Sequence, residues 1–225
     1  MSLSTLSIEI VNCTRCRRLL DWAGTRKGKR NKFIDEEYWA RPVPGFGDPE
    51  ARLLIVGLAP GAHGANRTGR PFTGDTAGDH LYNALFRHGF SNKKISKDRF
   101  DGLRLKDVFI TNVVRCLPPG DKPDKTELSS CMDYLKREIE LLSNIKVILA
   151  LGKKAFDQLK IILRDNNFET KHLIFKHGAC YTFENKFPAL KASYHTSKRN
   201  YIRGIMNDGE LDKIFSDINF LQNMV

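Results

Sequence analysis

The residues best suited to chemistry in this sequence are its cysteines. Cys13 and Cys16 form a C-x2-C pair in the segment NCTRC, and 14 residues separate Cys116 from Cys131. Four thiolates at these places could close a site that ties an N-terminal arm to the domain, and zinc and a [4Fe–4S] cluster both accept four cysteines. Spacing leaves that choice open, and two buried thiols beside a chance pair are the alternative. Cys180, in the segment ACYTF, is predicted to be a packed free thiol in a strand.

The segment 57–78, GLAPGAHGANRTGRPFTGDTAG, is the second candidate for chemistry. Glycines let a backbone approach a ligand closely and present bare N–H groups. The segment contains six of them: Gly57, Gly61, Gly64, Gly69, Gly74 and Gly78. Such a loop could cradle a phosphate, so a nucleotide-binding loop is a competing interpretation. It is neither a P-loop, because no Gly-Lys-Ser/Thr follows, nor a G-x-G-x-x-G turn.

Short apolar segments that alternate with helical patterns must position these residues. The predicted strands are residues 52–56, 107–113, 146–151 and 188–194, and the predicted helices are residues 78–88, 125–142, 153–163 and 198–221. Leu81, Leu85 and Phe86 are expected on one side of the first helix, and Thr126 is the predicted cap of the second. This alternation predicts the α/β class, as a three-layer α/β/α fold with a central, mainly parallel four-stranded sheet.

The edge of this sheet is where a ligand is expected. In such folds ligands bind beyond the carboxyl ends of the strands. The glycine-rich segment follows the first predicted strand, while TNVVRCLPP (111–119) and SYHTSKRN (193–200) lie at the ends of the second and the fourth. The three segments are therefore predicted to meet and form a pocket.

The bulk composition indicates one soluble domain. With 225 residues and 41% hydrophobic content, the chain is predicted to fold as a single domain over 1–225, with a cysteine-containing arm at about 1–50. No apolar run approaches the roughly 18–20 residues that span a bilayer, and the start MSLSTLSIEI lacks signal-peptide features. We therefore expect an intracellular, cytoplasmic protein with no membrane partner. In the reducing cytoplasm, the five cysteines of the chain are not expected to form a disulfide framework.

The charge balance favours a polyanionic partner. The 37 Lys and Arg residues exceed the 26 Asp and Glu residues, giving a net charge of +11. Contacts between basic side chains and phosphates release condensed counterions, so nucleic acid is the favoured partner, although basic proteins can simply be soluble. A basic loop at residues 24–32 is a candidate for phosphate contact, although such charge runs are usually solvated. Its basic residues are Arg26, Lys27, Lys29, Arg30 and Lys32.

The segment 57–79, GLAPGAHGANRTGRPFTGDTAGD, resembles the first active-site motif of the uracil-DNA glycosylase superfamily. The sequence of this segment is similar to that of the family 5 (UdgB type) enzymes of thermophilic bacteria and archaea, so a prokaryotic or archaeal thermophile is the expected source. The related family 4 enzymes place an acidic residue beside Ala-Pro, where this chain has Leu58. The resemblance continues through TNVVRCLPP, SYHTSKRN and the four cysteines, and it covers most of the chain from Cys13 to about Arg203.

This resemblance implies a monofunctional DNA glycosylase that acts in base excision repair. The expected enzyme is a monomer that flips uracil out of DNA and excises it hydrolytically, leaving an abasic site. The apolar Leu58 fits a broader range, with hypoxanthine and other deaminated or damaged bases as further substrates. Two other interpretations are a non-enzymatic iron–sulfur DNA-binding module and a nucleotide-binding enzyme. Asn112 and His195 lie at separate strand ends, which favours a pocket and therefore an enzyme over a non-enzymatic module. A nucleotide-binding enzyme would need a metal-binding set of Asp and Ser residues, and none is found in the sequence.

The resemblance also implies a cofactor. Cys13, Cys16, Cys116 and Cys131 would ligate a [4Fe–4S] cluster, which favours iron–sulfur over zinc. The cluster is expected to be structural, because excision of a base by water involves no electron transfer.

Three residues gain catalytic roles from the resemblance. His195 matches the histidine that donates to O2 of the departing base. Asn112 matches the base-reading asparagine, whose amide can donate and accept at once. Asp75 matches the acidic residue that positions the attacking water or stabilises the sugar cation. The structural alternatives are a satisfied turn histidine, an asparagine at a strand end, and a cap for the helix that begins near Thr76.

The other predicted contacts surround the base and the DNA. Phe72 matches the aromatic residue that stacks on the flipped base, with an ordinary core position as the alternative. His63 is expected to touch the base or the water, while Arg199 and Asn200 would meet the DNA backbone or fill the vacated stack. Thr196 stands where many relatives have proline, which is expected to loosen the turn. Besides Asn112 and His195, the predicted base-binding residues are Gly57, Ala59, Pro60, Gly61, His63 and Phe72.

Overall fold

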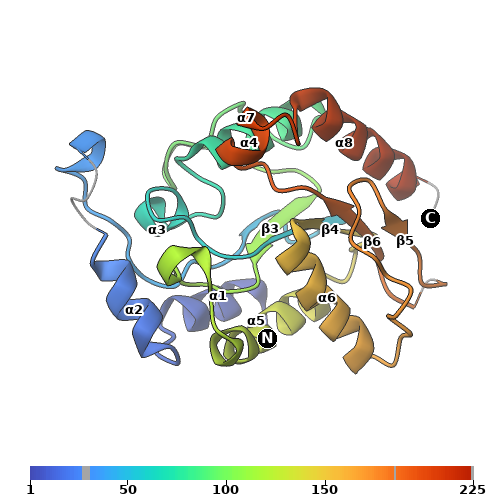
Figure 1. Cartoon of the computed structure of the whole chain (residues 1–225), viewed down its shortest axis with the longest axis horizontal. Coiled ribbons are helices and arrows are strands. Elements are labelled where there is room, and N and C mark those ends of the chain that lie inside the picture. Colours follow the sequence, from blue (N-terminus) through green and yellow to red (C-terminus); the bar gives the residue numbers. More distant parts are fainter. Residues whose placement is uncertain (27–30, 185, 224–225) are drawn as a thin grey trace.

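A sheet with the strand order β1-β3-β2-β4-β6-β5 runs through the centre of the molecule (Figure 1). The computed structural model describes residues 1–26, 31–184 and 186–223. The four central strands pair in parallel and are almost entirely buried. They are β3 Val108–Asn112, β2 Leu53–Gly57, β4 Val147–Leu151 and β6 Ala189–Ser193. The predicted α/β fold and its four parallel strands are confirmed.

Two short antiparallel strands extend the predicted sheet. The strand β1 Phe46–Gly47 pairs with β3, and β5 Cys180–Tyr181 pairs with β6. Both lie at the edges, where one side of a strand has no neighbour. Cys180 is exposed there. The prediction of a packed Cys180 thiol is therefore wrong, because an edge strand leaves this side chain open to solvent.

Helices cover both faces of the sheet and complete the predicted three layers (Figure 1). Successive residues of a strand point to opposite faces. In β2, Leu54 and Val56 join one apolar cluster, whereas Leu53 and Ile55 join the other. The first cluster includes residues of α1 Leu3–Val11, α2 Arg17–Gly24, α5 Lys125–Leu141 and α6 Lys153–Asp165. The second includes residues of α4 Thr76–Arg87 and α8 Asp208–Asn223.

Two details of the predicted helices are wrong. Phe86 is 37% exposed, because one residue turns a helix by about 100° and carries this ring away from the buried Leu85. The cap of α5 is Asp124 rather than Thr126. The Asp124 carboxylate accepts from the N–H of Glu127 at 2.8 Å, and the Glu127 carboxylate accepts from the N–H of Asp124 at 2.9 Å. This reciprocal capping box fixes the start of the helix at Lys125, the predicted position, with a different residue as its cap.

The last predicted helix, 198–221, is divided in two. The short α7 Lys198–Ile202 ends before Gly204, whose φ of +65° leaves the helical region, and α8 begins at Asp208. Three further short elements are α3 Ala65–Thr68 and the 3-10 turns η1 Asn31–Phe33 and η2 Pro119–Asp121. None of the helices within the described ranges has the length and apolarity to cross a bilayer.

Candidate active site

A cavity of about 310 Å³ opens at the carboxyl ends of β2, β3 and β6. Its walls come from the loop after β2, the end of β3, the turn η2 and the turn after β6. The lining residues are Leu58, Ala59, Gly61, Ala65, Phe72, Asp75, Ala77, Asn112, Asp121, His195 and Ser197. The three segments that were predicted to meet therefore do form one pocket.

Asp75 is both a helix cap and a residue of the cavity wall. It is the N-cap of α4, and its Oδ1 accepts from the N–H of Gly78 at 2.9 Å. Its Oδ2 lies toward the glycine-rich loop, where a Cβ added to Gly64 would come within 1.9 Å of it. Burial raises the pKa of Asp75, against the opposing effect of the backbone hydrogen bonds from Gly78 and Ala77. One carboxylate thus caps a helix and lines the cavity.

Phe72 forms an aromatic wall of the cavity. It is buried, and its φ of +51° is unusual for any residue other than glycine. Its ring centroid lies 5.8 Å from that of His195, with 31° between the planes. A Cβ at Gly57 would lie 2.7 Å from the ring carbon Cζ of Phe72 and 2.4 Å from Oδ1 of Asn112. Because Gly57 has no side chain, Phe72 and Asn112 can both approach its backbone closely. Gly57 itself does not line the cavity.

Asn112 carries an unpaired polar atom at the end of β3. The residue is only 3% exposed. Its Oδ1 is buried and finds no donor among the described residues. Buried side-chain acceptors in folded proteins nearly always have a partner. An unpaired acceptor in a ligand-sized cavity is therefore the feature expected of a group that waits for a ligand N–H.

His195 follows β6 and faces the same cavity. Burial lowers the pKa of its imidazole, while the carboxylate of Asp121 acts in the opposite direction. The balance favours a neutral ring at neutral pH. A neutral imidazole can still donate one hydrogen bond to a developing negative charge.

Side-chain hydrogen bonds fix the turn that carries His195. Asn200 donates from Nδ2 to the carbonyl oxygen of His195 at 2.8 Å. Thr196 is fully buried, and its Oγ1 donates to the carbonyl oxygen of Ala77 at 2.9 Å. Many relatives have a rigid proline at this position. Here the hydrogen bond of Thr196 instead connects the loop that carries His195 to the first turn of α4.

Asp121 is a cavity residue that sequence reasoning missed. It lies at the end of η2 with a φ of +57°. The segment PPGDKP around it predicts a turn, because Pro, Gly and Asp are typical turn residues. No signal in that segment places the carboxylate in the same cavity as His195, since this placement depends on how two distant loops meet.

Several predicted contacts lie outside the cavity lining. His63 is half-buried, and its Nδ1 lies 2.8 Å from the hydroxyl of Tyr38. Pro60 is buried within the loop, and Arg199 is exposed on α7. Of the predicted basic loop, Lys27, Lys29 and Arg30 lie outside the described residues. Arg26 is described, and its guanidinium carbon lies 4.0 Å from the ring centroid of Trp22.

The four cysteines of the predicted ligand set lie in one apolar cluster away from the cavity lining. Cys116 and Cys131 are buried, and Cys13 and Cys16 of the arm pack against them half-buried. Burial, together with the neighbouring Cys131, Glu127 and Cys13, raises the pKa of Cys16 to about 11. Burial and nearby cysteines likewise raise the pKa of Cys116. The arm and the body of the domain are thus joined at these thiols.

The spacing of these thiols is not that of a closed site for one metal ion. Within the described ranges, no three His, Cys, Asp or Glu side chains converge closely enough to hold a single ion. Four sulfur donors in an apolar, partly exposed setting still suit a larger group, because an iron–sulfur cluster accepts four cysteines.

Comparisons with known proteins show the family of this chain. The family model for the uracil DNA glycosylase superfamily matches residues 44–219. A protein of Thermus thermophilus named type-5 uracil-DNA glycosylase is 47% identical over 188 residues, which are 84% of each chain. Proteins of the same name are 43% identical in Mycobacterium leprae, over 96% of this chain and 94% of the relative, and 40% identical in Pyrobaculum aerophilum, over 87% and 82%.

Proposed function

The chain belongs to the uracil-DNA glycosylase superfamily, and we propose that it is a type-5 enzyme whose cavity receives a uracil flipped out of DNA. It hydrolyses the N-glycosidic bond between uracil and deoxyribose and leaves an abasic site for repair. The cavity of about 310 Å³ is of a size for a single base. Flipping a nucleotide costs a few kcal/mol of stacking and pairing, so favourable contacts between the cavity and the base must offset that cost.

The observation that carries this function best is the unpaired Oδ1 of Asn112. An unsatisfied buried acceptor costs about 1–3 kcal/mol. Uracil offers N3–H as a donor and O4 as an acceptor, and a side-chain amide can serve both at once. Phe72 adds a stacking surface for the base, worth roughly 1–3 kcal/mol. Recognition and stacking together offset the energy of flipping.

The chemistry follows from where charge develops. The bond from C1′ of the sugar to N1 of the base breaks with its electron pair leaving on uracil, so the base becomes negative and the sugar positive. His195 donates a hydrogen bond to O2 of the departing base. The lowered pKa of His195 favours a neutral imidazole, which can still make this donation. The departing base is later protonated, and the oxygen of water joins C1′.

Asp75 serves the opposite side of the reaction. Its Oδ2 positions the attacking water and accepts its proton, while the negative charge stabilises the sugar cation. Because burial raises its pKa, Asp75 is a stronger base than an exposed aspartate. Asp121 supplies a second carboxylate to the cavity wall.

We also propose that Cys13, Cys16, Cys116 and Cys131 hold a [4Fe–4S] cluster. Their close packing in an apolar cluster supports this, because buried thiols that raise the pKa of one another need a cationic partner to become thiolates. When bound, the group joins the arm to the domain, and it takes no part in hydrolysis. A brown protein with visible thiolate-to-iron absorbance is the expected result, and a colourless zinc protein would contradict it.

The base range is proposed to extend beyond uracil. The cavity wall beside Ala59 is formed by the apolar Leu58 rather than by an acidic side chain. This surface imposes no hydrogen-bond requirement on that edge of the base, which supports excision of hypoxanthine. Competition between uracil and hypoxanthine in one flanking sequence measures this preference.

Excision itself is tested with an oligonucleotide that contains a single uracil. Incubation followed by alkali is expected to cleave the strand at the uracil, and the matched thymine strand is expected to stay intact. Absence of an abasic product from the cluster-loaded protein would overturn the proposal. We further expect His195→Ala to lose about 100-fold in rate with little change in DNA affinity. Equal losses of both would remove its catalytic role.

A further inference from the structure

The segment from Arg70 to Asp75 carries two of the cavity residues on an unusual backbone. Phe72 has a φ of +51° and Gly74 a φ of +80°. A left-handed conformation is strained for a phenylalanine and persists only where the surroundings hold it. The ring of Phe72 and the carboxylate of Asp75 therefore depend on whatever fixes this segment from outside.

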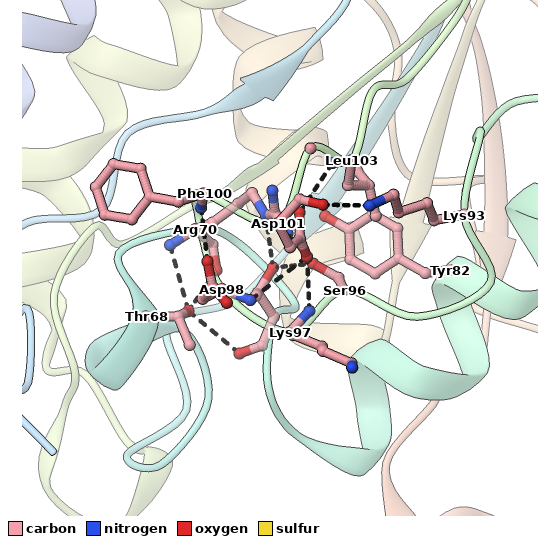
Figure 2. Close-up of polar contacts among 12 residues, drawn as sticks. Thr68, Arg70, Tyr82, Lys93, Ser96, Lys97, Asp98, Phe100, Asp101 and Leu103 are labelled. Atoms are coloured by element: carbon pink, nitrogen blue, oxygen red, sulfur yellow. Dashed lines mark hydrogen bonds and ion pairs between the residues drawn. The ribbon is translucent and has the colours of Figure 1, made fainter.

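Arg70 is the centre of a buried polar network that grips this segment (Figure 2). Its side chain is only 3% exposed. The Nη2 group donates to Oδ2 of Asp101 at 2.7 Å and to Oγ of Ser96 at 2.6 Å, and Nε donates to Oγ1 of Thr73 at 3.0 Å. Thr73 and Ser96 share a further hydrogen bond of 2.6 Å between their hydroxyls. The network thus joins residues 70–73 to a loop that follows α4.

Asp101 organises that loop, residues 91–103, from its inner side. Its carboxylate accepts from the N–H groups of Lys97 and Leu103, each at 2.8 Å, and from that of Asp98 at 3.4 Å. Burial opposes the ionisation of Asp101, but the hydrogen bonds from Arg70 and from the loop outweigh it and lower its pKa to about 2. The loop is therefore built around a carboxylate that stays charged.

Further contacts carry this anchoring to the residue before Asp75. The N–H of Gly74 donates to the carbonyl oxygen of Ser96 at 3.0 Å, and Arg67 donates from Nη2 to the carbonyl oxygen of Gly74 at 3.2 Å. On the other side, the hydroxyl of the buried Tyr82 donates to the carbonyl oxygen of Pro71 at 3.1 Å. The chain on both sides of Phe72 is thus held by side chains that do not reach the cavity.

We propose that Arg70 and Asp101 are positioning residues of the excision site, a role that rests on the proposed function. Their ion pair locks the loop 91–103 against residues 70–75 and so holds Phe72 and Asp75 at the geometry that the reaction needs. Neither residue lines the cavity, and neither is expected to touch DNA in order to act.

Stability alone is a poor reason for such a pair. Removing two charges from water is expensive, and an apolar pair of similar volume is often as stable. What the ion pair adds is direction, since a guanidinium fork can bind Asp101, Ser96 and Thr73 at once. A displacement of about 1 Å at a reacting group can lower a rate by about 100-fold. The effect of losing the pair should therefore appear in the chemical step.

The test compares the single-turnover rate of uracil release by the wild type with that of two variants. Asp101→Asn keeps an oxygen for the loop N–H groups but leaves Arg70 without its anion. The double variant Arg70→Met, Asp101→Asn removes both charges, so no charge is left buried and unpaired. We expect both variants to fall about 100-fold in rate, with a much smaller change in the Kd for DNA that carries a non-cleavable uracil analogue.

Phe100→Ala is the matched control on the same loop. Phe100 is 82% exposed, and its ring points away from the Asp101 carboxylate (Figure 2). It is expected to keep the wild-type rate. Melting temperatures are measured in parallel, and rates are taken well below the lowest of them. A double variant that stays folded and releases uracil at the wild-type rate would overturn the positioning role. So would a loss of rate that merely follows the unfolded fraction.

The same experiment separates this role from the proposed function. If the wild type releases no uracil, the proposed function fails, whatever the variants do. If the wild type is active and the folded double variant equally so, only the positioning role fails. Arg70→Lys adds a graded check, because an ammonium keeps the charge without the fork. Its rate is expected between those of the wild type and the double variant, and full activity would contradict the need for the fork.

Discussion

The excision cavity and the cysteine cluster both place titratable side chains away from water, and they differ in what fills the space between them. The cavity leaves about 310 Å³ open and keeps the acceptor Oδ1 of Asn112 unpaired. The cysteines instead pack into the apolar cluster that joins the arm to the sheet. An open space with an unpaired polar atom suits a ligand that comes and goes. A packed set of donors suits a resident group.

The two regions also use burial in opposite ways. In the cavity, burial raises the pKa of Asp75 and lowers that of His195, which makes one a better base and keeps the other neutral. In the cluster, burial raises the pKa of Cys16 and Cys116 and so disfavours the thiolates that a metal needs. The first region exploits the shift directly. In the second region, a bound cation would reverse the shift, so the proposed cluster would decide the protonation state of these thiols.

The largest expected effect comes from Asp75→Asn. Asparagine caps a helix about as well as aspartate, so the variant separates the two roles of this residue. We expect the rate of uracil release to fall by about 1,000-fold, because a positioned acid or base contributes about 100- to 10,000-fold. Single-turnover kinetics and a melting curve measure the two roles side by side. A folded variant with the wild-type rate would reduce Asp75 to a cap.

Removal of a cysteine should change the other region. Cys13→Ser is expected to lower the iron content and the visible absorbance. If loss of the group costs about 3 kcal/mol, Tm falls by roughly 6–12 °C for a domain of this size. Cys180→Ser is the matched control, because Cys180 is an exposed edge-strand thiol outside the cluster. Equal iron content in the Cys13 and Cys180 variants would contradict the proposed ligand set.

The pH dependence of excision should report the cavity alone. Burial raises the pKa of Asp75 above its ordinary value of 3.8. Because the ionised form acts, the rate is expected to fall about tenfold per pH unit once the pH drops below that raised pKa. The acid limb should vanish in Asp75→Asn. A limb that persists in this variant would assign the titration to another group.

The same shift has a consequence for stability. A carboxyl whose pKa is raised by folding favours the folded state when protonated, and that contribution is lost as the pH rises through the raised pKa. At neutral pH we therefore expect Asp75→Asn to be at least as stable as the wild type in thermal melting. A clear drop in its Tm would show that the charge itself supports the helix end.

The smallest expected effect is that of Thr196→Val. The variant keeps the shape of the side chain and loses the hydrogen bond to the carbonyl oxygen of Ala77. One such bond contributes about 0.5–1.5 kcal/mol, so we expect the excision rate to fall by about two- to tenfold. His195 is still present but less firmly held. An unchanged rate and Tm would show that packing alone fixes the turn.

The sequence predicts the central strands well because they are buried apolar runs between clear turn signals. It also brings Asp75, Asn112 and His195 to one edge, since each follows a parallel strand or its loop. The edge strands β1 and β5 have two residues each and carry no periodic pattern. The predicted cap Thr126 is wrong for a different reason: Asp124 followed three residues later by Glu127 is a capping-box signature that the prediction overlooked.

Contacts between distant residues lie beyond what one sequence reveals. Asp101 stands 31 positions after Arg70, and nothing around either residue announces the pair. Asp121 likewise reads as a turn residue until the fold brings η2 to the cavity. The unpaired oxygen of Asn112 is a property of the packed structure alone, because it depends on every donor that fails to reach it.

The rate of uracil release per folded molecule tests the separation of the two regions most directly. It is measured in single turnover for the wild type, Asp75→Asn and Cys13→Ser, well below their melting temperatures. We expect the cavity variant to lose about 1,000-fold and the folded cysteine variant to stay within about threefold of the wild type, since its change lies outside the reacting groups. A folded cysteine variant that loses as much rate as the cavity variant would contradict the separation.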